Sequence, residues 1–94
     1  MRGARGVDVT DEDREEALQW LLKEKRLLAG LTQKQLADLL GRVQSFVSDC
    51  ESGQHAVTVV EFLRFCDVLE LDPRSAIRRV AAGKLRSRKQ PNQP

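Results

Sequence analysis

The sequence is poor in the residues that mark several common classes of protein. It has no tyrosine, one tryptophan, three phenylalanines and two cysteines, and the cysteines lack the spacing of a metal site. No apolar run approaches the roughly 20 residues of a membrane-spanning helix, and no apolar segment follows the N-terminal arginines as in a signal peptide. These absences disfavour a membrane protein, a zinc protein and a disulfide-rich secreted protein. Two thiols outside any such pattern suit a reducing cytosol.

Signs of catalysis are also missing. His55 is the one histidine, and the chain has no nucleophile–base pair, glycine-rich phosphate loop or metal motif. The acids between Asp8 and Glu16 are better explained as complements of a helix dipole than as an acid–base site. We therefore expect neither an enzyme nor a bound metal or cofactor.

What the chain does have is the composition of one small helical domain. It has 94 residues, of which 40% are hydrophobic and 32% charged, which fits a globular fold better than disorder. Residues 75–94 hold six Lys/Arg and no acid, whereas the residues before them are slightly acidic. A basic end suits an anionic partner, nucleic acid before membrane, although a solvated tail without a role would look the same.

Capping signals divide the chain into five helices. Thr10 and the acids after it begin a helix over about 11–29, and the pairs Thr32/Gln35 and Thr58/Glu61 form capping boxes. Further boundary signals are Gly30, Gly41, Gly53, Asp72-Pro73 and Gly83. They predict helices between 32 and 41, over about 44–52, from about 59, and from 73 to about 83. The prediction is one all-α domain over 10–83, with a flexible lead over 1–9 and a flexible basic tail over 84–94.

Apolar residues at helical spacing form a stripe on each predicted helix. Trp20 and the thiols of Cys50 and Cys66 are expected to pack with these stripes. The residues expected to face inward are Ala17, Leu18, Leu21, Leu22, Leu28, Leu36, Ala37, Leu39, Leu40, Val47, Val59, Phe62, Leu63, Phe65, Leu69, Ile77, Val80 and Ala81.

Several short motifs in one register point to a family. They are Arg26, Gly30, Leu31-Thr32-Gln33, Leu36-Ala37, Gly41, Gln44-Ser45, Val47-Ser48, Glu51, Gly53 and Leu69-Glu70-Leu71-Asp72-Pro73. From about Leu21 to Val80 the chain resembles the phage-repressor/Cro-like helix-turn-helix family, also called the xenobiotic-response-element (XRE) family. The resemblance implies a compact five-helix, lambda-repressor-like domain. It further implies a bacterial or phage transcriptional regulator, in the first instance a repressor, that binds double-stranded operator DNA as a homodimer.

The same resemblance implies roles for individual residues. In the helix over 44–52, the residues expected to read base edges are Gln44, Ser45, Ser48 and Asp49. Those expected to contact the DNA backbone are Gln33, Lys34, Arg42, Gln54 and His55. Arg26 and Glu51 match the family's partly buried ion pair, which is structural.

Three departures from the family pattern keep other readings open. Val43 stands where a capping residue is usual, and Asp49 brings a negative charge to the expected DNA surface. The loop after Gly53 lacks the usual Lys/Arg, so Lys34 and Arg42 are the main cations of that surface. Because phosphate contacts supply much of DNA affinity, we expect modest affinity unless a dimer or the basic tail adds contacts. The alternatives are an antitoxin-like regulator that also binds a toxin, and a protein–protein adaptor that has lost DNA binding.

Overall fold

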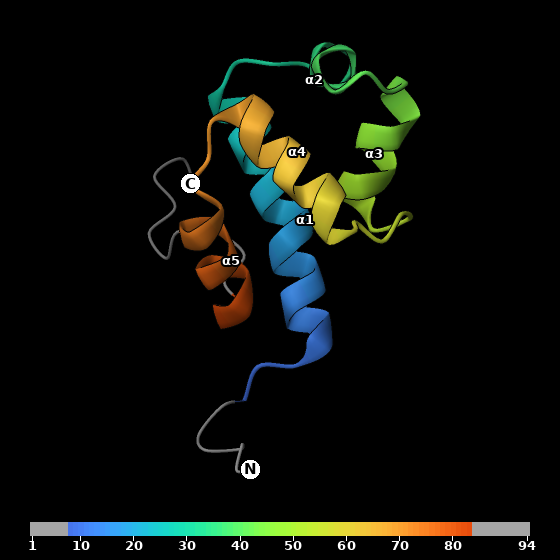
Figure 1. The fold of residues 1–94 in the computed structure, drawn as a ribbon. Helices are drawn as coiled ribbons and strands as arrows, with labels where there is room; N and C mark the ends of the chain where they lie inside the picture. Colours follow the sequence, from blue (N-terminus) through green and yellow to red (C-terminus); the bar gives the residue numbers. More distant parts are fainter. Residues whose placement is uncertain (1–7, 84–94) are drawn as a thin grey trace, which may run out of the picture.

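The computed structural model describes residues 8–83, and within them it contains five α-helices and no strand (Figure 1). The helices are α1 (Asp11–Leu28), α2 (Gln33–Leu40), α3 (Gln44–Ser52), α4 (Val59–Leu69) and α5 (Pro73–Ala82). The predicted five-helix, all-α fold is therefore confirmed. The basic tail expected over 84–94 and most of the lead expected over 1–9 lie outside the described residues. Within residues 8–83, no helix is long and apolar enough to cross a membrane.

Reciprocal side-chain caps begin three of the helices. The Thr32 hydroxyl accepts from the Gln35 amide at 3.0 Å while the Gln35 side chain accepts from the Thr32 amide at 2.9 Å. Thr58 and Glu61 form the same pair at the start of α4, so both predicted capping boxes are confirmed. Thr10 adds a third with Asp13. Each box satisfies two backbone amides that the first helical turn leaves without partners.

The end of α3 shows why glycine is required at one of the predicted boundaries. Gly53 is the C-cap of α3 with φ +87°, a left-handed conformation that other residues adopt only with strain. A Cβ there would also lie 2.7 Å from Nε2 of Gln19 on α1. The C-terminal end of α3 therefore rests closely against α1.

Two adjoining clusters of buried side chains form the core. One joins α1, α2, α3 and α4, and the other joins α1, α4 and α5; the half-buried Leu18 packs against both. The first contains Leu22, Leu36, Ala37, Leu40, Phe46, Val47, Cys50 and Phe65, and the second Leu21, Phe62, Cys66 and Ala76. Both cysteines are buried free thiols. Burial raises the pKa of the Cys50 thiol to about 11 and raises that of Cys66 as well, so both stay protonated at neutral pH and pack as small apolar side chains.

Several apolar residues expected in the core are instead exposed. They are Leu28, Leu39, Val59, Leu63, Ile77 and Ala81. On α5 the buried residue is Ala76, whose small side chain suits close packing against Leu21 and Phe62. Sequence periodicity marks the centre of an apolar stripe better than its width. Short helices covered on one side bury a narrower arc, and the outer members of each predicted stripe lie beyond it.

Candidate nucleic-acid interface

The interface predicted from the sequence centres on α3, which lies with α2 on the side of the molecule away from α5 (Figure 1). Gly41, with φ +71°, ends α2, and a three-residue turn leads into α3. Phe46, Val47 and Cys50 hold α3 in the core. Gln44 and Ser45, in its first turn, are consequently exposed, and Ser48 and Asp49 are half-buried one turn later. The four predicted base-reading residues thus share one short helix.

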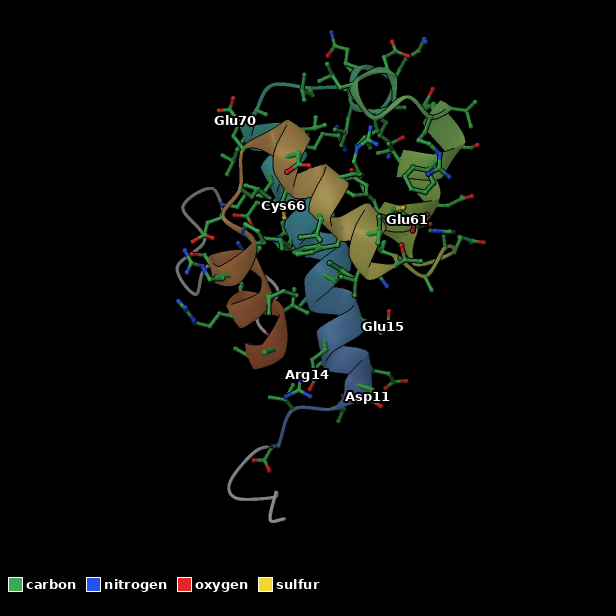
Figure 2. All side chains as sticks on the ribbon, viewed as in Figure 1. Asp11, Arg14, Glu15, Glu61, Cys66 and Glu70 are labelled. Carbon is green, nitrogen blue, oxygen red and sulfur yellow. The ribbon has the colours of Figure 1, made fainter. Side chains whose placement is uncertain are left out.

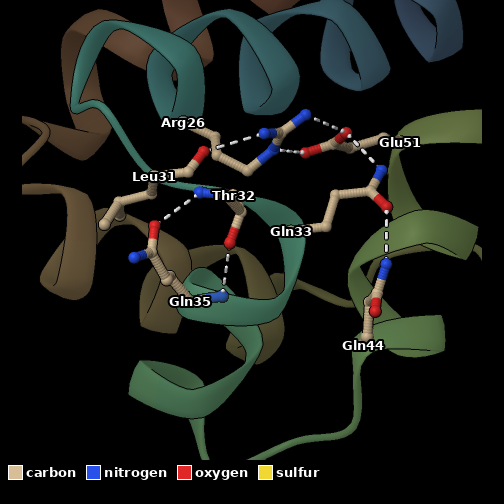
Figure 3. Close-up of polar contacts among 7 residues, drawn as sticks. All are labelled: Arg26, Leu31, Thr32, Gln33, Gln35, Gln44 and Glu51. Carbon is tan, nitrogen blue, oxygen red and sulfur yellow. Dashed lines mark hydrogen bonds and ion pairs between the residues drawn. The ribbon is translucent and has the colours of Figure 1, made fainter.

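A buried ion pair links α1 to α3. Arg26 Nε donates to Glu51 Oε2 at 2.7 Å and its NH2 group to Oε1 at 3.1 Å, with side-chain exposures of only 8% and 4%. A third donor of Arg26 binds the carbonyl oxygen of Leu31 at 2.8 Å (Figure 3). Two-point contact between a guanidinium and a carboxylate fixes orientation as well as distance. The pair therefore sets how α3 sits on α1 and on the loop before α2.

Gln33 connects this ion pair to the first residue of α3. Its side-chain nitrogen donates to Glu51 Oε1 at 3.1 Å, and its oxygen accepts from Gln44 Nε2 at 3.4 Å (Figure 3). A chain of polar contacts thus runs from buried Arg26 to exposed Gln44. A role for Gln33 in binding phosphate remains a prediction; the contact shown is one that orients Gln44.

The first turn of α3 lacks a side-chain cap. Val43 occupies the N-cap position with φ −85° and ψ 159°, and it makes no side-chain cap hydrogen bond. This is the departure from the family pattern noted in the sequence. Since a capping side chain stabilises a helix by about 1 kcal/mol, the first turn of α3 is held less firmly than the starts of α2 and α4.

A second acidic residue, Glu61 on α4, contacts side chains just before and just after α3. Its Oε1 accepts from the Thr58 amide and contacts His55 Nε2, both at 2.9 Å, and its Oε2 is 3.8 Å from Arg42 NH1. The Arg42 guanidinium also stacks 3.8 Å from the Phe46 ring centroid. Figure 2 shows Glu61 at the end of α4 nearest α3. The Thr58 amide, followed by His55, lowers the pKa of Glu61 below its usual value, so the group is a carboxylate at neutral pH.

The other two residues predicted to contact the DNA backbone, Lys34 and Gln54, lie apart from the Arg26–Glu51 pair and from the contacts of Glu61. Lys34 is exposed on α2 and pairs with Asp38 one turn later at 3.3 Å. Gln54 is exposed in the loop after α3. These two are accessible to a ligand, while Arg42 and His55 already share an internal anion.

Sequence reasoning missed this role of Glu61, which it treated only as a capping partner. It also missed Arg64, which donates to the Leu40 carbonyl oxygen at the end of α2 at 3.2 Å, and the Arg79–Glu24 pair between α5 and α1. The partners in these contacts come from different elements. The position of Glu61 two residues inside α4, close after the loop that carries His55, was the one available signal.

An exposed helix with a polar first turn, braced on a preceding short helix, defines the class: a helix-turn-helix DNA-binding domain. The family model described as "Helix-turn-helix domain" matches residues 17–80. An XRE-family like protein from Pseudomonas syringae pv. tomato str. DC3000 is 38% identical, with 87% of this chain and 96% of that one covered and a TM-score of 0.71. The chain belongs to the XRE family of helix-turn-helix regulators.

Two further solved structures are similar. The restriction-modification controller protein C.AhdI from Aeromonas hydrophila is 32% identical, covering 71% of this chain and 99% of that one with a TM-score of 0.63. The clp gene regulator ClgR from C. glutamicum is 24% identical, covering 72% and 88% with a TM-score of 0.66, a likeness of fold alone. A comparison with curated proteins found no match.

Proposed function

We propose that this protein is a sequence-specific transcriptional repressor that places α3 in the major groove of double-stranded DNA. The observation that carries the proposal is the chain of contacts from the buried Arg26–Glu51 pair through Gln33 to exposed Gln44. A side chain at the start of an exposed helix is oriented from the core, as base recognition requires. Repression needs only occupancy of a promoter, which a single small domain can supply.

Each polar residue of α3 has a base-edge chemistry that suits this role. A glutamine such as Gln44 can bond an adenine through two hydrogen bonds, and Ser45 and Ser48 can donate or accept. Asp49 can accept from the amino group of cytosine, but its charge opposes phosphates. Gln33, Lys34, Arg42, Gln54 and His55 are proposed as backbone contacts on either side of the groove.

A homodimer is part of this proposal, because two α3 helices about 34 Å apart would fit half-sites one turn apart on DNA. Exposed apolar side chains near the start of α4 and on α5 supply a surface for the second copy, namely Val59, Val60, Leu63 and Ile77. Val59, Leu63 and Ile77 also line a groove of about 180 Å³, together with Leu18, Phe62 and Val80. A two-fold axis here would bring the apolar side chains and the groove of one copy against those of the other.

The test is selection from a random DNA duplex library followed by binding of the selected duplex at two salt concentrations. We expect an enriched two-fold symmetric sequence whose binding is weakened by Gln44→Ala and Ser45→Ala. Ser75→Ala, a matched exposed substitution on α5, should leave it unchanged. Light scattering of the free protein and of Ile77→Asp tests the dimer. The proposal fails if no sequence is enriched or if the α3 variants bind as the parent does.

An adaptor that binds protein in place of DNA is the second candidate. It is favoured by the apolar side chains of Leu39 and Val43, exposed on α2 and in the turn before α3, and by Asp49 on α3. Duplex binding that is absent, and that Asp49→Lys restores, would support it. Enrichment of an operator by the wild-type protein would exclude it.

A further inference from the structure

Glu61 contacts two side chains that flank α3 in the sequence, those of Arg42 and His55. Arg42 comes from the turn before the helix and His55 from the loop after it, and both reach the same carboxylate. The rings of Phe46 and His55 lie 5.3 Å apart, and the Arg42 guanidinium stacks on Phe46. The four side chains therefore form one cluster along one side of α3, beside the proposed base-reading residues.

The carboxylate of Glu61 is held firmly, whereas its contact with Arg42 is loose. Its side chain is 20% exposed and is fixed by the Thr58 amide and by the backbone of α4. The Arg42 side chain is 46% exposed, and its 3.8 Å separation from the carboxylate is longer than a hydrogen bond. The pairing thus reduces the charge that Arg42 presents to solvent without burying its donors.

This arrangement matters because DNA affinity depends on cations that replace the counterions of phosphates. A guanidinium already compensated by a neighbouring carboxylate contributes less to that exchange. We propose, on the basis of the DNA-binding function proposed above, that Glu61 is an affinity-setting residue. Its carboxylate acts as an internal counter-anion that lowers phosphate binding by Arg42, so that binding relies more on base contacts from α3.

Glu61→Gln tests this role without removing the helix cap. Glutamine serves as well as glutamate in a capping box, and its amide oxygen can still accept from the Thr58 amide and from His55. The substitution therefore removes the charge and keeps the acceptor. Circular dichroism and urea unfolding should show a folded variant, and Asp67→Asn, which removes an exposed acid elsewhere on α4, supplies a matched change of net charge.

The experiment is a double-mutant cycle on the full chain. Wild type, Glu61→Gln, Arg42→Ala, the double variant and Asp67→Asn are titrated with the selected duplex and with a random duplex at several salt concentrations. We expect Glu61→Gln to tighten binding to both duplexes and to steepen the slope of log K against log salt by up to about 0.9, the value for one phosphate contact. Arg42→Ala should abolish most of that gain, and Asp67→Asn should produce little of it.

Three results would overturn the role of Glu61. Weaker binding by Glu61→Gln would mean that the carboxylate orders Arg42 for phosphate, and an equal gain with and without Arg42 would mean that it acts only through total charge. An equal gain from Asp67→Asn would mean the same. If the wild type selects an operator and one of these results is found, the role of Glu61 is rejected but the proposed function stands. Random-duplex binding that rises through Arg42 without any selected sequence would sustain the role of Glu61 and reject sequence-specific reading, whereas no binding by any variant would reject both.

Discussion

Two carboxylates, Glu51 on α3 and Glu61 on the neighbouring α4, show how the same group serves two purposes. Glu51 is 4% exposed and meets Arg26 through two hydrogen bonds, whereas Glu61 is 20% exposed and shares its oxygens among Thr58, His55 and Arg42. A buried charge depends on its protein partners, because water cannot replace them. A surface carboxylate can lose a partner to solvent or to a ligand. Burial and geometry therefore decide whether an ion pair supports the fold or adjusts the charge of the surface.

Removal of the Glu51 carboxylate should have a large effect on stability, because its Arg26 partner is buried. Glu51→Ala leaves the Arg26 guanidinium buried without its carboxylate, which should lower the free energy of unfolding by about 3–5 kcal/mol. Urea unfolding followed by circular dichroism measures it, with Glu61→Gln as the control that should change little. A loss below about 1 kcal/mol would show that the buried pair is not the structural element described here.

A second prediction tests whether the contacts from the buried Arg26–Glu51 pair through Gln33 to Gln44 affect base recognition. Gln44→Ala should cost about 1–3 kcal/mol of discrimination between the selected duplex and one with that base pair changed. Its free energy of unfolding should be unchanged, since Gln44 is exposed. Gln33→Ala should lose part of the same discrimination, because it removes the group that orients Gln44. Full discrimination in Gln33→Ala would show that this contact is irrelevant to reading.

The third prediction concerns Val43, which begins α3 without a side-chain cap. Val43→Thr keeps the shape of the exposed valine and adds the hydroxyl that an N-cap uses, so it should stabilise the protein by about 1 kcal/mol. The denaturation midpoint reports the gain, and Val43→Ala, which changes the same side chain but adds no hydroxyl, is the matched control. If both variants behave alike, the absent cap is not what limits α3.

The smallest effect is a dependence on acid. Because the Thr58 amide and His55 lower the pKa of Glu61 from 4.5, this carboxylate contributes stability that is fully present above that value. The contribution disappears as pH falls through the lower folded-state pKa. Unfolding of wild type and Glu61→Gln, compared near neutral pH and below about pH 4, should show the smaller acid sensitivity in the variant. Equal acid sensitivity of the two proteins would show that Glu61 does not contribute to stability against acid.

Much of the fold could be predicted because its boundaries depend on local chemistry. The Thr32/Gln35 and Thr58/Glu61 boxes and the Asp72-Pro73 start need only neighbouring residues. The Arg26–Glu51 pair spans 25 residues, and only the family resemblance pointed to it.

The rest could not be predicted because it depends on how helices meet. Nothing in the α4 pattern separates buried Phe62 and Cys66 from exposed Val59 and Leu63 until α1 and α5 cover one side. The same holds for Glu61: its cap is a local signal, but its contact with Arg42 requires the turn before α3 to approach the start of α4.

The close packing of α3 against α1 at Gly53 has a consequence for how the DNA target of such a regulator changes in evolution. This packing is formed by the buried side chains of α3 and by a glycine backbone near Gln19, so none of it depends on Ser45. Substitutions at an exposed position of this kind usually change stability by no more than about 0.5 kcal/mol. After gene duplication, a copy could acquire a new target sequence through such positions while inheriting the scaffold unchanged. At Gln44 a new target would also require a change at Gln33, because the Gln33 side chain contacts that of Gln44.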